Sequence, residues 1–245
     1  MSPRQGPLPK AWLGASDQMK ALHIRLEGFS ATYPYPFLKS GTQLTMPLPP
    51  FSSIFGNLSA CAGRPVGPTE TAIAVEFRSR GTGTDLETTR RLRTDKTHGK
   101  LSRNPEPGIA KREFHVAPQL DLYLTATEME SIFLRPVAVP CLGRSQDLAW
   151  ITLVRRIELV PVASGRLGPT LVPFPNPQVG GLISPPLADY FQNDSVGFVR
   201  TAGRYSRYQF VADGTNVRSS VGFDLYRPDD SESEQHAVVL HQFSV

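Results

Sequence analysis

The sequence predicts an α+β fold whose core elements follow the order strand, helix, strand, strand, helix, strand, as in ferredoxin-like and RRM domains. Three observations lead to this fold class. Residues 19–160 change between strand-type and helix-type apolar spacing in that order. Hydrophobic residues make up 40% of the 245-residue chain, which is enough for a core. The 23 prolines, nearly twice the usual share of about 5%, disfavour an all-helical bundle.

The first three elements follow from local patterns. Residues 21–27 carry apolar side chains at every second position, which is typical of a strand with one buried face. A helix follows, with Ser52 or Ser53 as its N-cap and Gly63 as its stop. Residues 71–78 alternate again and predict the second strand.

The next three elements complete the predicted core. Residues 114–125 predict the third strand. Thr127 and Glu130 have the spacing of a capping box that opens a short helix. Residues 145–149 predict a further helical turn, and the β-branched run over residues 151–160 predicts the fourth strand.

The predicted organisation has three parts. Residues 1–18 read as a flexible tail, and residues 19–160 as the ferredoxin-like domain with residues 79–113 inserted as a long basic hairpin. Residues 161–245 are predicted to be a proline-rich connection, up to residue 186, followed by a small β-rich C-terminal subdomain. The strands expected in that subdomain cover residues 196–200, 208–211, 221–226 and 237–243.

The positive charge of the chain is concentrated in the inserted segment. From Arg78 to Glu113, ten basic and five acidic residues give a net charge of +5, whereas the rest of the chain has a net charge of −1. The segment has too few apolar residues for a core of its own. It therefore predicts an extended, solvated hairpin or a segment that is disordered until bound. Such a charge concentration indicates a polyanionic partner, and a plain solvated loop is the alternative.

Several classes of site are not expected. Cys61 and Cys141 are too few for a disulfide scaffold or a four-ligand zinc site, and both are predicted to be core residues. The histidine spacing predicts no metal site, and the sequence has no Walker A or Gly-x-Ser-x-Gly motif, so no metal or other cofactor is expected. No apolar run approaches the roughly 20 residues of a membrane span, so no membrane contact is expected and the cytoplasm is the expected compartment.

Two motifs carry a resemblance to a known family. A strand ending Glu27-Gly-Phe29 leads to a Tyr-Pro-Tyr-Pro loop and then to Met46-Pro-Leu-Pro-Pro-Phe-Ser-Ser-Ile-Phe-Gly-Asn-Leu-Ser-Ala-Cys-Ala-Gly63. Later, Val139-Pro-Cys-Leu-Gly-Arg-Ser-Gln-Asp-Leu-Ala149 precedes the last core strand, and Lys111-Arg-Glu-Phe114 enters the third. Over residues 20–160 the chain resembles the CRISPR-associated protein 5 family of the RAMP superfamily, in its type I-B-like form. The C-terminal third matches only in length and β-rich character.

The resemblance implies a non-catalytic, RNA-binding subunit of a type I CRISPR Cascade complex that caps the 5′ handle of the crRNA. The inserted hairpin would be a thumb beside the first backbone subunit. The implied partners are the crRNA, the backbone subunit (protein 7 family), the large subunit (protein 8 family) and target DNA through the complex, with the crRNA-processing endonuclease (protein 6 family) as a further candidate. The candidate RNA-binding residues are Arg25, Ser52, Ser53, Arg78, Arg80, Arg90, Arg91, Arg93, Lys96, Lys100, Lys111, Arg112 and Arg144.

Some of these residues have a purely structural alternative. The two serines can be ordinary N-caps, or they can present helix N-terminal amides to a phosphate. Arg144 can form an ion pair with Asp147 or hold a phosphate. Tyr33 and Tyr35 can pack beside their prolines or stack on bases.

Two other functions stay open at the sequence level. In one Cascade subtype, members of the family cut precursor crRNA without a metal, using a tyrosine and an adjacent lysine–histidine pair. Here no Lys-His dipeptide occurs, although Lys111 and His115 can share a strand face. The second alternative is a generic β-rich nucleic-acid-binding protein. Whether the complex serves interference or, as in CRISPR-associated transposons, guided transposition is not decided by the sequence.

Overall fold

The main sheet is centred on β1 (Met19–Gly28), whose alternate residues Leu22, Ile24 and Leu26 are fully buried. The computed structural model describes residues 18–38, 41–90, 92–94, 99–103, 108–193, 200–220 and 222–244. β1 lies between two antiparallel partners in the strand order β10-β1-β9-β4. The other three strands are β4 (Ile73–Arg78), β9 (Gln119–Leu124) and β10 (Ala149–Val162).

Helix α1 (Phe51–Ala62) packs on the face of this sheet that carries Leu22 and Ile24. The predicted serine N-cap is wrong, because Pro50 is the N-cap and its carbonyl accepts hydrogen bonds from the amides of Ser53 and Ile54. The extended backbone of Pro50 starts the helix before either serine, so both serines lie in its first turn. The predicted stop is confirmed, because Gly63 adopts a left-handed conformation with φ of 66°.

The second helical segment consists of η2 (Thr127–Met129) and α2 (Glu130–Leu134). The helix lies where the sequence predicts it, but the capping box is not formed. Neither η2 nor α2 has a side-chain cap hydrogen bond, because the segment begins as a 3-10 turn from Ala126.

The predicted strand over residues 114–125 is two strands in two sheets. It breaks at Ala117, which has a positive φ of 47° and donates a hydrogen bond to the carbonyl of Phe29. The part before the break is the end of β8, which belongs to a smaller sheet at one side of the main sheet. The strands of this smaller sheet are β2 (Ser30–Ala31), β3 (Thr42–Gln43), β5 (Gly81–Thr89) and β8 (Gly108–Val116).

The C-terminal third extends the main sheet. The prediction of an irregular connection over residues 161–186 is wrong in part, since β10 continues to Val162 and two further strands follow. The full sheet has the order β18-β11-β20-β19-β10-β1-β9-β4. The C-terminal strands are β11 (Ser164–Leu167), β12 (Thr170–Pro173), β13 (Leu187–Ala188), β14 (Phe191–Asn193), β15 (Arg200–Ala202), β16 (Tyr205–Ser206), β17 (Tyr208–Val211), β18 (Thr215–Arg218), β19 (Leu225–Pro228) and β20 (His236–Val239).

Four strands were expected in this part of the chain, and one matches its predicted bounds. Residues 208–211 form β17 as predicted. The strand expected over residues 221–226 instead begins at Leu225, and the one expected over residues 237–243 ends at Val239. Most of the strand expected over residues 196–200 lies outside the described residues.

Candidate nucleic-acid interface

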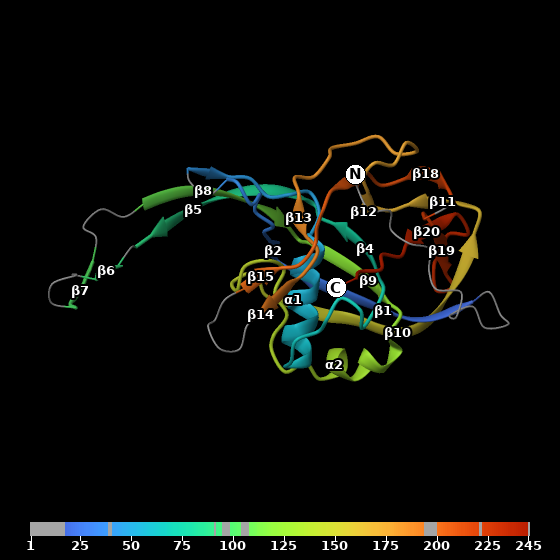
Figure 1. Cartoon of the computed structure of the whole chain (residues 1–245), viewed down its shortest axis with the longest axis horizontal. Helices are drawn as coiled ribbons and strands as arrows, with labels where there is room; N and C mark the ends of the chain where they lie inside the picture. Colours follow the sequence, from blue (N-terminus) through green and yellow to red (C-terminus); the bar gives the residue numbers. More distant parts are fainter. Residues whose placement is uncertain are drawn as a thin grey trace.

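The basic segment forms a long antiparallel hairpin. β5 and β8 pair without interruption from Gly81 opposite Val116 to Thr89 opposite Gly108. Beyond them, β6 (Leu92–Thr94) pairs with β7 (Leu101–Arg103). In Figure 1 the hairpin extends as a curved arm away from the helices and the main sheet.

The base of the hairpin is anchored by buried polar contacts on one face. His115 is buried, and its Nε2 lies 2.9 Å from the carbonyl oxygen of Met46. Its Nδ1 lies 3.2 Å from the hydroxyl of Ser79, and burial lowers the pKa of the imidazole. Two positions earlier, the carboxylate of Glu113 accepts a hydrogen bond from the amide of Thr45. These contacts join β8 to the segment that leads into α1.

A series of alternating charges fixes the opposite face of the hairpin to the body of the protein. Arg112 on β8 forms an ion pair with Glu87 on β5. The same carboxylate lies 3.7 Å from the guanidinium of Arg144, which also binds Asp147 at 3.0 Å. The side chain of Asp147 is fully buried and accepts a further hydrogen bond of 2.6 Å from Ser30. Burial would raise the pKa of Asp147, but hydrogen bonds from Arg144 and Ser30 lower it.

The Leu-Gly-Arg-Ser-x-Asp-Leu motif builds the turn that holds Arg144. The residues predicted as a helical turn, 145–149, instead form a hydrogen-bonded turn that leads directly into β10. At the centre of the motif, Gly143 has a φ of 107°, and a Cβ there would lie 1.9 Å from the carbonyl oxygen of Thr32. The glycine therefore lets the turn pack against the backbone that follows β1.

The distal part of the hairpin is basic and also exposes apolar side chains. Residues 88–109 contain six basic and two acidic residues, a net charge of +4 that equals that of the whole chain. Four apolar side chains on the hairpin are 65–69% exposed: Leu86, Leu92, Leu101 and Ile109. Leu86 and Ile109 are diagonal neighbours in the β5–β8 register, and Leu92 and Leu101 are diagonal neighbours in the β6–β7 register.

The predicted RNA-binding residues fall into two groups in the structure. Arg80, Arg90, Lys100 and Lys111 are exposed on the hairpin. Arg112 and Arg144 are held by carboxylates, so for Arg144 the ion-pair alternative is the one formed. Arg91, Lys96 and the side chain of Arg93 lie outside the described residues. Ser52 and Ser53 are half-buried in the first turn of α1.

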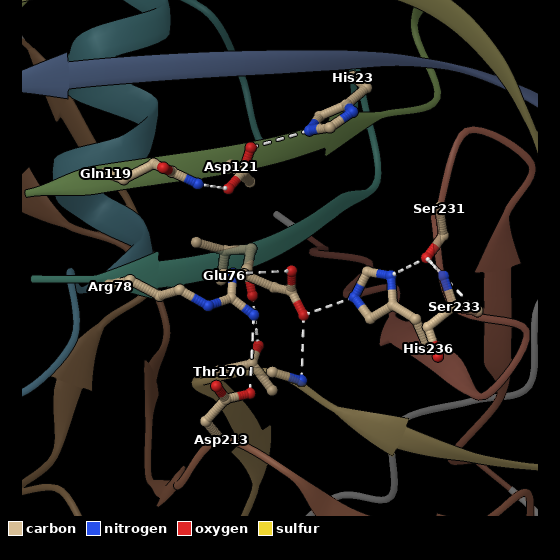
Figure 2. A network of polar contacts seen from close by, with 12 residues as sticks. His23, Glu76, Arg78, Gln119, Asp121, Thr170, Asp213, Ser231, Ser233 and His236 are labelled. Atoms are coloured by element: carbon tan, nitrogen blue, oxygen red, sulfur yellow. Dashed lines mark hydrogen bonds and ion pairs between the residues drawn. The ribbon is translucent and has the colours of Figure 1, made fainter.

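Arg25 and Arg78 lie elsewhere, on the face of the main sheet opposite to the one on which α1 packs. Arg25 donates through Nε to Asp121 at 2.7 Å, and Arg78 lies 3.4 Å from Glu76 and 3.6 Å from Asp213. Figure 2 shows Arg78 between these two carboxylates, and Asp121 on the neighbouring strand. Both arginines line a cavity of about 710 Å³ on this face.

Sequence reasoning missed two sets of histidine–carboxylate contacts on this face, one at the buried His23 and one at the half-buried His236. The two ring nitrogens of His23 lie 2.9 Å from Asp121 and 2.7 Å from Asp230. His236 lies 2.8 Å from Glu76. Burial would lower the pKa of His23, but its hydrogen bonds to the two carboxylates raise it. The sequence signal was a polar residue at alternating strand positions for His23, Glu76 and Asp121, which also fits a solvated face, and Asp230 lies in the turn after β19.

Three other features of the described residues bear on function. The part of the chain that the structure describes contains no group of three or more histidine, cysteine or acidic side chains placed to hold a metal ion. Cys61 is buried as predicted, whereas Cys141 is only half-buried. No helix among the described residues is both long and apolar enough to cross a membrane.

Comparisons with known proteins give structural neighbours only. No protein-family model matches the chain, and no curated protein matches it in sequence. One similar solved structure is a chain of a "CRISPR RNA-guided surveillance complex", with 18% identity, 81% of this chain and 91% of that chain covered, and a TM-score of 0.48. A CRISPR protein from Archaeoglobus fulgidus has 9% identity, coverage of 92% and 100%, and a TM-score of 0.46.

A chain of the Type III-B Cmr-beta complex bound to cognate target RNA and AMPPnP has 9% identity, coverage of 81% and 86%, and a TM-score of 0.39. These neighbours are CRISPR-associated proteins. Similarities at this level do not assign a function, so the function of this chain has to follow from its own residues.

Proposed function

We propose that this protein is a non-catalytic, RNA-binding subunit of a type I CRISPR Cascade complex, with a ferredoxin-like RAMP core, and that it caps the 5′ handle of the crRNA. The observation that carries the proposal is the hairpin arm, whose distal part holds a net charge equal to that of the whole chain. Clustered lysines and arginines supply the electrostatic part of RNA binding by releasing counterions from phosphates.

The exposed apolar residues favour an assembly role over a simple solvated loop. A hairpin that served only as a solvated surface would gain nothing from four leucine and isoleucine side chains that are 65–69% exposed. On this arm they lie beside basic residues. The combination fits a surface that contacts RNA phosphates and an adjacent protein subunit together, as the family resemblance implies for the first backbone subunit.

The turn formed by the Leu-Gly-Arg-Ser-x-Asp-Leu motif, before β10, also supports this function. Arg144 and Glu87 connect the turn before β10 to the hairpin, and the buried Asp147 holds Arg144 in place. The arm is therefore held in a defined direction relative to the sheet. A defined direction is what a capping subunit needs in order to place its arm between RNA and a neighbouring subunit.

The endoribonuclease alternative has less support from the geometry. His115 is buried, its lowered pKa favours the neutral form, and both ring nitrogens already have partners. Lys111 is four positions away along an extended strand, about 13 Å at 3.3 Å per residue. A general acid–base pair has to reach the same ribose, and these two side chains are far apart for that.

The experiment that tests the proposal removes only the distal arm. Residues 88–109 are replaced by Asn-Gly, which joins the cross-strand partners Glu87 and Ala110 and keeps the anchored base. The variant is co-expressed with guide RNA and the other complex subunits. We expect an unchanged far-UV spectrum but no stable first backbone subunit at the 5′ end of the guide.

A charge-reversal variant with a matched control tests whether assembly depends on the positive charge of the arm or only on its presence. Changing Arg90, Arg91 and Arg93 to Glu alters the charge of the arm by −6. The control changes the same number of exposed arginines elsewhere, namely Arg135, Arg207 and Arg218. We expect only the arm variant to lose assembly. Complete complexes with normal guide affinity in both arm variants would overturn the proposal.

A further inference from the structure

An exposed aromatic pair lies at the base of the hairpin, on the sheet face opposite to the one on which α1 packs. Phe29, directly after β1, is 83% exposed, and Trp150 on β10 is 43% exposed. Their ring centroids are 5.1 Å apart at an interplanar angle of 62°, so the two rings form a corner. Large aromatic side chains usually bury most of their surface, and such exposure indicates a binding surface.

The strand register places a row of polar side chains on the same sheet face as this pair. Trp150 is opposite Glu27, Glu27 is opposite Gln119, and Gln119 is opposite Arg78. Their chain neighbours Leu26, Leu120 and Phe77 belong to the core under the helices, so these four residues share the opposite face. One step along the strands, Arg25 is opposite Leu153, and both line the cavity of about 710 Å³. This volume is in the range of sites for small molecules.

Several hydrogen-bonding atoms on this face are available to a ligand. In the described part of the chain, the hydrogen bond that Arg25 makes uses Nε, which leaves its two terminal nitrogens as donors. Gln119 uses its amide nitrogen to donate to Asp121 at 2.7 Å, which leaves its amide oxygen as an acceptor. The side chain of Arg78 is 40% exposed.

We propose that Phe29 and Trp150 form a stacking platform for one or two unpaired nucleotides of single-stranded RNA, with Arg25, Arg78 and Gln119 contacting base edges or phosphate. This inference deepens the proposed RNA-binding function and rests on it. Single-stranded RNA is recognised by aromatic stacking and hydrogen bonds to base edges, and an open four-stranded sheet is a common surface for both.

The composition of the face favours RNA over a protein partner. The centre of a protein interface is depleted of charged residues, whereas Glu27 lies opposite Trp150, and the cations Arg25 and Arg78 share this face, with Arg78 three strands away from Trp150. Two further aromatic residues of this face, Tyr123 and Tyr226, are buried, and Tyr123 stacks on His23 with ring centroids 4.5 Å apart. The exposed aromatic side chains of this face therefore lie on β10 and directly after β1.

Base stacking and phosphate binding predict different changes in tryptophan fluorescence when RNA is added, so the platform can be tested in the full chain. With Trp12 changed to Phe, Trp150 is the single tryptophan, since the chain has two. Its fluorescence is titrated with a single-stranded oligoribonucleotide of about eight nucleotides and with an abasic strand of the same length. We expect quenching by the first strand and none by the abasic strand, which carries the same phosphates.

Leucine variants test whether RNA affinity depends on stacking by a flat aromatic ring or only on a hydrophobic side chain. Affinity for labelled RNA is measured for Phe29→Leu and Trp150→Leu, with Phe174→Leu as the control because Phe174 is also exposed. We expect each platform variant to bind roughly 5- to 100-fold more weakly, with an unchanged salt dependence, and Trp150→Phe to retain most of the affinity. The control should bind like the wild type.

Three results would overturn the platform. The first is equal quenching of Trp150 fluorescence by the abasic strand, and the second is wild-type RNA affinity of both leucine variants. The third is a platform variant that loses a protein subunit from the complex while its RNA affinity is unchanged, which would make the face a protein-binding surface. The proposed function is tested on a different element, because the arm truncation keeps Phe29 and Trp150. If the platform variants lose RNA affinity but the arm truncation still assembles, the proposed function has failed. If the arm truncation loses assembly but the platform variants bind RNA normally, the platform has failed.

Discussion

At the scale of single residues, His23 links the C-terminal strands to the centre of the sheet by a protonated imidazole. Both ring nitrogens face carboxylates, so both must donate, and the hydrogen bonds raise the pKa of His23 despite its burial. The pKa of a histidine in the unfolded chain is about 6.5. Because the pKa of His23 is higher in the folded protein, protonated His23 contributes its full stabilisation at pH values below 6.5. That stabilisation is lost as the pH rises through the folded pKa.

We therefore expect the free energy of unfolding to fall as the pH rises above 6.5. His115 and His241 have lowered pKa values and are neutral in both states above pH 6.5, so they do not contribute there. Urea unfolding at several pH values checks this, and His23→Gln should flatten the profile. An equally steep profile in the variant would contradict the assignment.

Gly143 is a second residue on which the fold depends. A Cβ at this position would lie 1.9 Å from the Thr32 carbonyl oxygen, and a φ of 107° is unfavourable for any other residue. We expect Gly143→Ala to lower the free energy of unfolding by about 2–5 kcal/mol. The matched control is Gly56→Ala, on the exposed side of α1 with no atom within 4 Å of the added Cβ. The control should stabilise by about 0.5–1 kcal/mol.

At the scale of elements, the hairpin should determine how RNA binding responds to salt. Six basic residues lie in residues 88–109, and each phosphate that they neutralise contributes about 0.7 to the slope of log affinity against log salt for a single strand. We expect the truncated hairpin to reduce the slope by up to about 4. Titrations of single-stranded RNA at several salt concentrations measure it. A slope equal to that of the full chain would mean that the arm does not contact phosphates.

At the scale of the whole molecule, we expect no site-specific cleavage of repeat RNA in the absence of metal ions. The reason is that the histidine nearest to Lys111 in sequence, His115, is a buried group that holds the hairpin base. The assay incubates labelled repeat RNA with the wild type and with His115→Gln, which retains a side-chain donor. A discrete product that appears with the wild type and disappears with a folded His115→Gln variant would favour the nuclease.

The sequence by itself determined the elements whose signals are local. The alternation of β1, the helix ending at Gly63 and the alternation of β4 depend on neighbouring residues, and all three formed where they were predicted. The charge of the hairpin is likewise readable from composition. The start of α1 was missed by two or three residues because Pro50 adopts the cap conformation without a side-chain hydrogen bond.

Only the tertiary structure decided which of these elements meet. The break at Ala117 separates β8 from β9 because a contact with Phe29, far away in sequence, fixes the backbone there. The same long-range pairing brings His23 to Asp230, Glu87 to Arg144 and Phe29 to Trp150. Each of these contacts joins residues separated by 57 to 207 positions. Local propensity acts over a few residues, whereas burial and charge pairing act between strands, so the candidate binding surfaces arise from the register of the sheet.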